Sequence, residues 1–111
     1  MLAKNNRLRD KKKISYIFKK GKRTNGSFFS LVYLPSGENN FKAVFLIAKK
    51  VSQKATRRNR IRRLLSESVR LIQKEKNLPK INLVVRVLFD PKDVKLDNIK
   101  KDFEKCFEKL S

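Results

Sequence analysis

The chain has 111 residues, a length typical of one domain, and hydrophobic residues make up 40% of it, enough for a modest core. It carries 30 Lys and Arg residues against 10 Asp and Glu, which gives a formal net charge of +20, and it has no His. The charge favours a polyanionic partner, nucleic acid or an anionic membrane surface, and the lack of His removes the most frequent general base and metal ligand.

The compartment can be judged from what the sequence omits. No stretch approaches the ~18 apolar residues of a membrane span, and residues 1–13 are basic and polar, unlike a secretory signal. The single cysteine, Cys106, excludes an intramolecular disulfide and is predicted to be a small buried residue on a helix. We therefore expect a cytoplasmic protein with a single domain over residues 1–111, of which residues 1–10 form a loose basic leader.

The first half of the chain predicts one helix and two strands. Residues 11–20 form a helix with Ile14, Ile17 and Phe18 on one face, and Gly21 follows at the C′ position. Residues 27–34 are rich in aromatic and β-branched side chains and predict a strand. A turn at 35–40 leads to a second strand at 41–48. We expect these two strands to pair as an antiparallel hairpin.

The second half predicts a long helix, a strand and a final helix. Residues 55–76 place apolar residues on one face at helical spacing. Residues 81–89 are nearly all apolar, as in a strand covered on both faces. A last helix at 96–110 has as its inner side Leu96, Ile99, Phe103, Phe107 and Leu110. The order is α-β-β-α-β-α, a mixed sheet packed against helices.

The segment from 49 to 63, KKVSQKATRRNRIRR, holds eight Lys and Arg residues and no acid. At 100° per residue, Arg57 and Arg58 lie on the same side of the helix as Ile61 and the apolar face. Unpaired arginines do not enter an apolar core, so we expect the first turn to project beyond the core edge and to face a groove or solvent. Arginine binds phosphate in a bidentate manner and stacks on bases, and the lack of acids here favours RNA binding over an ordinary solvated helix face.

Residues 47–71, IAKKVSQKATRRNRIRRLLSESVRL, closely resemble the signature segment of the bacterial ribonuclease P protein. In that family a strand ends in Lys-Lys, and after a short loop Arg-Asn-Arg opens the long helix; here these are Lys49, Lys50 and residues 58–60. The N-terminal segment with Asn6, Arg7 and Leu8, and the helix carrying Phe18 before Gly21, resemble the family as well. The chain departs from the family pattern at three positions, which often hold an aromatic, a glycine and a basic residue: Ile14, Val44 and Ser66.

The resemblance implies a two-layer α/β (α+β) fold similar to the second domain of ribosomal protein S5. The family has three strands before the long helix, so a short additional strand near residues 22–25 completes the order α-β-β(-β)-α-β-α. The long helix joins two parallel strands by a left-handed crossover, against a general rule that is right-handed in roughly 98% of cases.

The resemblance also implies the function: the protein subunit of ribonuclease P, an endoribonuclease that removes the 5′ leader of precursor tRNA. The chemistry, with Mg²⁺, would belong to the RNA subunit, and the protein itself would hold no cofactor or metal. The residues implied to bind the RNA subunit are Lys49, Arg57, Arg58, Asn59, Arg60, Arg62 and Arg63. Those implied for a leader cleft between the sheet and the first helix are Ile14, Phe18, Val32 and Lys50. An aromatic face stacks on any base, whereas core packing is the alternative role for Phe18.

Three other functions would share some of these features. A small basic ribosomal protein would share the charge but needs no cleft for single strands. A DNA-binding regulator would place the basic helix in a major groove, but no helix precedes it at helix-turn-helix spacing. A metal-dependent nuclease would need a ligand set, and Asp90, Asp93 and Asp97 are better explained as caps between a strand and a helix.

Overall fold

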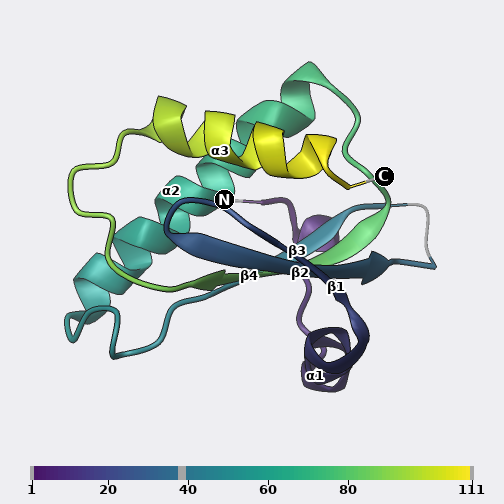
Figure 1. Cartoon of the computed structure of the whole chain (residues 1–111), viewed down its shortest axis with the longest axis horizontal. Coiled ribbons are helices and arrows are strands. Elements are labelled where there is room, and N and C mark those ends of the chain that lie inside the picture. Colours follow the sequence, from purple (N-terminus) through teal and green to yellow (C-terminus); the bar gives the residue numbers. More distant parts are fainter. Residues whose placement is uncertain (1, 38–39, 111) are drawn as a thin grey trace.

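The computed structural model of the chain describes residues 2–37 and 40–110. Its elements in chain order are the 3-10 helix η1 (Lys4–Asn6), α1 (Lys11–Lys20), β1 (Lys22–Asn25), β2 (Phe29–Pro35), β3 (Lys42–Leu46), α2 (Ala55–Glu75), β4 (Ile81–Val87) and α3 (Leu96–Glu108). Helices α2 and α3 cover one face of the sheet, and α1 lies across part of the opposite face (Figure 1).

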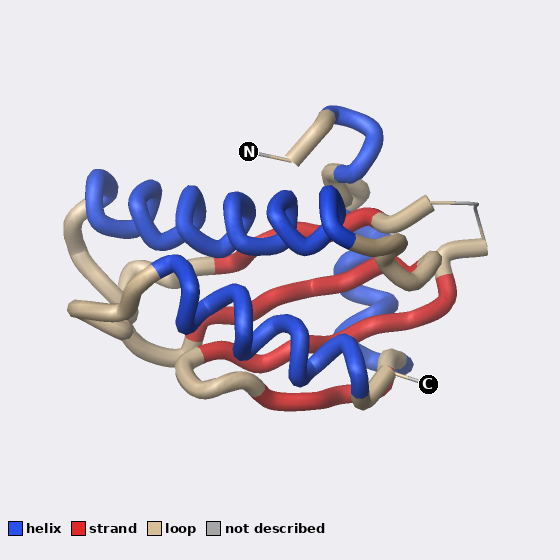
Figure 2. The backbone as a smooth tube through the Cα atoms, turned by 90° about the horizontal axis from the view of Figure 1, so that it is seen from above, coloured by secondary structure: helices blue, strands red, loops and turns tan. Residues whose placement is uncertain are grey.

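The four strands form one mixed sheet in the order β1-β2-β4-β3. β2 runs antiparallel to both β1 and β4, whereas β3 and β4 are parallel and are joined through α2. Figures 1 and 2 show that this crossover is left-handed. The fold class and the short additional strand at Lys22–Asn25 are therefore confirmed.

The predicted hairpin between the strands at 27–34 and 41–48 is wrong, because β4 lies between the corresponding strands β2 and β3. Val84 of β4 faces Val32 of β2 on one side and Val44 of β3 on the other. β4 takes this central place because it is apolar on both faces, with Leu83, Val84 and Val85 fully buried or nearly so. The hairpin is formed instead by β1 and β2. The predicted turn at 35–40 lies partly outside the described residues.

The larger core lies between the sheet and the pair α2 and α3. The rings of Phe29 and Phe103 stack with their centroids 4.6 Å apart. Cys106 is also buried there, as predicted, and burial raises the pKa of its thiol. β4 ends at Val87, two residues earlier than expected, and leaves Leu88 and Phe89 exposed.

The prediction that residues 1–10 form a loose leader is wrong for the described part of that segment. Leu2, Asn6 and Leu8 are buried. The Asn6 side-chain amide donates to the carbonyl of Phe41 at 2.7 Å, and the Leu8 amide donates to the carbonyl of Ala43 at 2.9 Å. The two leucines are spaced among cations, so the segment packs its apolar side chains against β3 and leaves the charges in solvent.

Gly21 ends α1 at the expected place but for a different reason. Its φ of −73° is extended backbone and not the left-handed C′ conformation. A Cβ at this position would lie 2.5 Å from the carbonyl oxygen of Ile17 and 2.7 Å from Cγ1 of Val32. Glycine is needed here because the chain passes close to β2 as it turns into β1.

Candidate nucleic-acid interface

The exposed side of the first turns of α2 carries unpaired cations. Arg60 and Arg63 are exposed, and neither side chain makes a hydrogen bond or ion pair with any described residue. Arg62 is half-buried and donates to the side-chain oxygen of Asn59 at 2.7 Å, which orients both groups along the helix. Lys49, in the loop before α2, is also exposed. Free guanidinium groups on one rigid helix suit phosphate binding.

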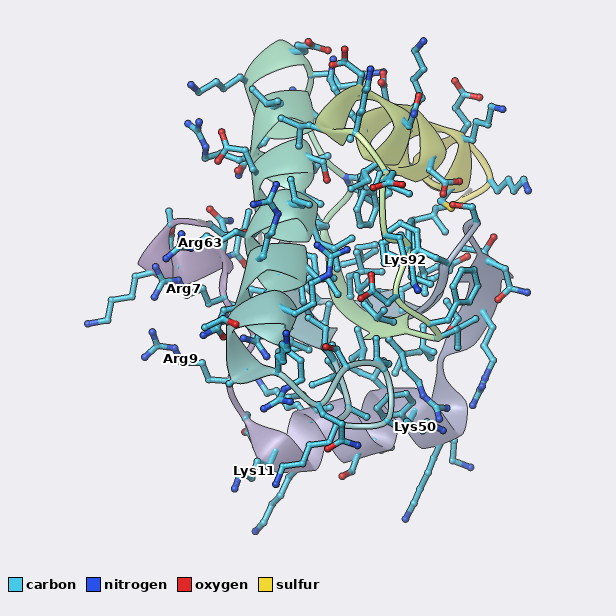
Figure 3. The ribbon with its side chains drawn as sticks, turned by 90° about the vertical axis from the view of Figure 1, so that its left-hand side faces the viewer. Arg7, Arg9, Lys11, Lys50, Arg63 and Lys92 are labelled. Atoms are coloured by element: carbon cyan, nitrogen blue, oxygen red, sulfur yellow. The ribbon has the colours of Figure 1, made fainter. Side chains whose placement is uncertain are left out.

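Two arginines of the N-terminal segment extend this surface. Figure 3 shows Arg7 and Arg9 projecting toward the same side of the molecule as Arg63. Arg7 is held in place by a bond from its Nε to the carbonyl of Leu2 at 2.9 Å. Sequence reasoning missed these two residues because it treated the segment as loose. The leucines at positions 2 and 8 were the signal that the segment is anchored.

The first turn of α2 faces a groove, as expected, but its arginines are already bonded within the protein. Arg57 forms a bidentate ion pair with Asp90, with Nε 3.0 Å from Oδ2 and Nη2 2.6 Å from Oδ1. Arg58 donates from Nη1 to the carbonyls of Ser52 and Gln53 at 2.8 and 3.0 Å. The inference that no acid pairs with these arginines is wrong for Arg57, because Asp90 in the loop after β4 reaches it.

The ion pair shifts the pKa values of both Arg57 and Asp90. Hydrogen bonds from Arg57 hold the pKa of Asp90 below its ordinary value, and Asp90 raises the pKa of Arg57. Asp90 therefore stays ionised at neutral pH. The predicted role of Asp90 as a helix cap is wrong: the N-cap position of α3 is Lys95, and no side chain caps it.

A groove of about 580 Å³ opens beside α1, on the face of the sheet that α1 only partly covers. Its lining residues are Phe18, Phe45, Leu46, Ile47, Ala48, Lys50, Arg62, Arg86 and Val87. Phe18 and Lys50, both predicted for a cleft, are thus brought together. Arg86 is a charged residue within the largely apolar segment 81–89, and the structure places it in the groove.

The other two predicted cleft residues, Ile14 and Val32, do not line the groove. Ile14 is half-buried and packs on the small cluster formed by Leu8, Ile17, Val32 and Val84 without lining the groove. Val32 is only 1% exposed, beneath α1, so it cannot contact RNA. Phe18 packs on the same cluster and lines the groove, so core packing and cleft lining are both roles of one half-buried ring.

Over residues 2–37 and 40–110, no three His, Cys, Asp or Glu side chains are grouped so that they could hold a metal ion. No helix in the same part of the chain has the length and apolar character needed to cross a membrane.

Free arginines along one helix, and an apolar groove rimmed by Lys50, Arg62 and Arg86, define a small basic α/β protein that binds nucleic acid. Residues 2–111 match the family described as Ribonuclease P, and the chain belongs to this family of ribonuclease P proteins.

Relatives and solved structures agree with that assignment. The chain is 38% identical over 87 residues to the ribonuclease P protein component of Syntrophomonas wolfei, a match that covers 78% of this chain and 72% of the relative. It is 37% identical over 93 residues to that of Prochlorococcus marinus, covering 73% and 69%.

Two solved structures share the fold at low identity. The RNase P protein of Thermotoga maritima superposes with a TM-score of 0.80 at 23% identity, covering 95% of this chain and 97% of that one. The RNase P protein of Staphylococcus aureus superposes with a TM-score of 0.78 at 20% identity, covering 95% and 94%.

Proposed function

We propose that this chain binds both the catalytic RNA of ribonuclease P and the 5′ leader of precursor tRNA, and that it does so in the cytoplasm. The observation that carries the proposal is the presence of two cationic surfaces, which meet at Arg62, on one small fold. One is the exposed side of α2, and the other is the groove beside α1.

The α2 surface is assigned to the RNA subunit. We assign to it Lys49, Arg58, Asn59, Arg60, Arg62 and Arg63, together with Arg7 and Arg9, which project toward the same side of the molecule. Arg58 uses only Nη1 for its bonds to Ser52 and Gln53, so the rest of its guanidinium remains available for phosphate. Cations that have no internal partner release the counterions of the RNA on binding, which favours assembly.

The groove is assigned to the leader. The half-buried ring of Phe18 offers a face on which a base can stack, and Lys50 and Arg86 offer charge to the backbone. Neither interaction reads a particular base, so leaders of different sequence would be held. Ile14, four residues before Phe18 on α1, packs on the same small cluster as Phe18.

Hydrolysis is assigned to the RNA subunit with its Mg²⁺. The two surfaces consist of cations, an amide and apolar groups, and the whole sequence lacks His. Such groups bind phosphates and bases but supply no general base near neutral pH. The role of this chain is to hold the substrate and neutralise charge around the catalytic RNA. A structural role on ribosomal RNA is less favoured, since the family is that of ribonuclease P.

The test is reconstitution. Precursor tRNA is incubated at low Mg²⁺ with a bacterial ribonuclease P RNA, with the purified chain, or with both. We expect 5′ cleavage only when both are present. Cleavage by the chain alone would contradict the assignment of chemistry to RNA. Failure of the chain to stimulate the RNA would contradict the proposed function.

A further inference from the structure

The ion pair between Arg57 and Asp90 ties the loop after β4 to the first turn of α2. Besides its bidentate bonds to Asp90, Arg57 donates from Nη2 to the carbonyl of Lys92 at 3.0 Å. Asp90 in turn accepts from the backbone amide of Lys92 at 2.8 Å. The two partners therefore bind both backbone polar groups of a single loop residue.

That residue has an unusual backbone. Lys92 has a φ of +56°, in the left-handed region that residues other than glycine rarely adopt. Asp90 and Arg57 hold it there through its amide and its carbonyl. The direction in which the Lys92 side chain leaves the loop consequently depends on the ion pair.

The loop and α2 together enclose a groove of about 650 Å³. Its lining residues are Arg57, Arg60, Leu64, Lys92, Asp93, Val94, Lys95 and Leu96. Arg60, Lys92 and Lys95 are exposed, and no described residue forms an ion pair with any of them. Figure 3 places Lys92 on the opposite side of α2 from Arg63. The groove is thus a cationic site that continues the α2 surface around the helix.

Building on the proposed function, we propose that Lys92 and Lys95 join Arg60 to bind a phosphate of the RNA subunit in this groove. Arg57 is then a positioning residue that acts through Asp90, and not an RNA contact. Its fork is occupied by the carboxylate, and its charge is neutralised there. The free charges of the groove are those of the two lysines and Arg60, opposed only by Asp93 among the lining residues.

The direction in which Asp90→Asn changes the affinity for RNA tests this proposal. Asp90→Asn raises the net charge by one, so general electrostatic attraction predicts tighter binding to RNA. The proposal predicts the reverse, a loss of roughly threefold to tenfold, because Lys92 is no longer held toward the groove. Asp93→Asn is the matched control. It makes the same charge change in the same groove, Asp93 forms no hydrogen bond with the described residues, and its loss should tighten binding.

A double-mutant cycle separates positioning from contact. If Arg57 acts only through Asp90, then Arg57→Ala, Asp90→Asn and the double variant weaken binding to a similar degree. If Arg57 touched the RNA itself, Asp90→Asn would be harmless and Arg57→Ala costly, which would overturn the proposal. Lys92→Ala and Lys95→Ala should each lower the slope of log affinity against log salt by about 1.

The measurement is the equilibrium affinity of each variant for a bacterial ribonuclease P RNA over a range of salt, beside its melting temperature. If the parent chain does not bind that RNA, the proposed function itself fails. If the parent binds and Asp90→Asn binds as tightly or more tightly, only the present inference fails. Should Asp90→Asn be unfolded at the assay temperature, the two lysine variants decide, since they remove only exposed side chains, and unchanged salt slopes would refute the site.

Discussion

The ring of Phe18 and the ammonium group of Lys50 line the same groove, although one comes from α1 and the other from the loop between β3 and α2. The pairing exists because α1 covers only part of its face of the sheet (Figure 1). Ile17, one residue earlier, points into the small cluster and is almost fully buried. Phe18 and Ile17 are adjacent on one helix but differ in role, so truncation of Ile17 can serve as the control for truncation of Phe18.

Phe18→Ala should weaken the binding of precursor tRNA by about 1–3 kcal/mol, the value of one base stacked on an aromatic ring. The affinity for mature tRNA, which has no leader, should stay the same. Because the ring is half-buried, we expect a smaller loss of stability than the ~3–5 kcal/mol of a fully buried Phe. Binding of both RNAs and thermal unfolding should be measured on the same variant.

Ile17→Ala is the control for that experiment. Ile17 is 2% exposed, so its truncation should cost ~2–5 kcal/mol of unfolding free energy without a selective effect on leader-bearing RNA. If the Phe18 variant discriminates leader-bearing from leaderless RNA as well as the parent does, the groove is not the leader site.

Arg60→Ala combined with Arg63→Ala should weaken binding to the RNA subunit roughly tenfold or more and lower the salt slope by about 2, because two unpaired cations are lost. The melting temperature should hardly change, since neither side chain has a partner among the described residues. Arg70→Ala, on the same helix, is the comparison: Arg70 is already paired with Glu67 at 2.5 Å. Arg70→Ala removes one charge instead of two, so a loss of binding free energy about half that of the double variant would show that total charge, and not this surface, governs binding.

The helices and the central strand could be predicted because their causes are local. The faces of α2 and α3 follow from apolar residues at helical spacing, and β4 is apolar on both faces. Strand pairing could not be predicted this way. The side chains of β3 alternate between the two faces of the sheet whether its neighbour is β2 or β4. Only the crossover through α2 decides that β3 pairs with β4. The resemblance to the family supplied the handedness, which general rules would have reversed.

The candidate site could be predicted only in part from the sequence. The run of arginines identified α2 as the cationic helix, whereas the cleft and the place of Phe18 in it came from the resemblance to the family. What the pattern could not tell is which arginines are already paired, because Asp90 reaches Arg57 from another element. It also could not show that Arg86 lines the groove, since a charged residue in an apolar strand has no local reason to be there.

The anchored N-terminal segment gives a prediction about stability. Leu8→Ala should cost ~2–5 kcal/mol of unfolding free energy, because Leu8 is 4% exposed within the cluster under α1. Arg9→Ala, at the exposed next position, should change stability by no more than about 0.5 kcal/mol while weakening RNA binding. Denaturant unfolding of the two variants tests this. Equal stability of both would mean that the segment is loose in solution.

The Arg57 and Asp90 pair predicts a pH dependence of stability with a defined sign. The pKa of Asp90 is lower in the folded chain than its ordinary value of 3.8. A depressed pKa means that the carboxylate contributes stability above the ordinary pKa and that this contribution is lost as pH falls through the folded value. The difference in unfolding free energy between the parent and Asp90→Asn should therefore be constant from pH 7 down to about pH 5 and should shrink at lower pH. Denaturant unfolding of both proteins at pH 7, 5 and 3 measures it. A difference that stays the same at pH 3, or that grows there, would show that Asp90 is not stabilised as a carboxylate by Arg57 in the folded protein.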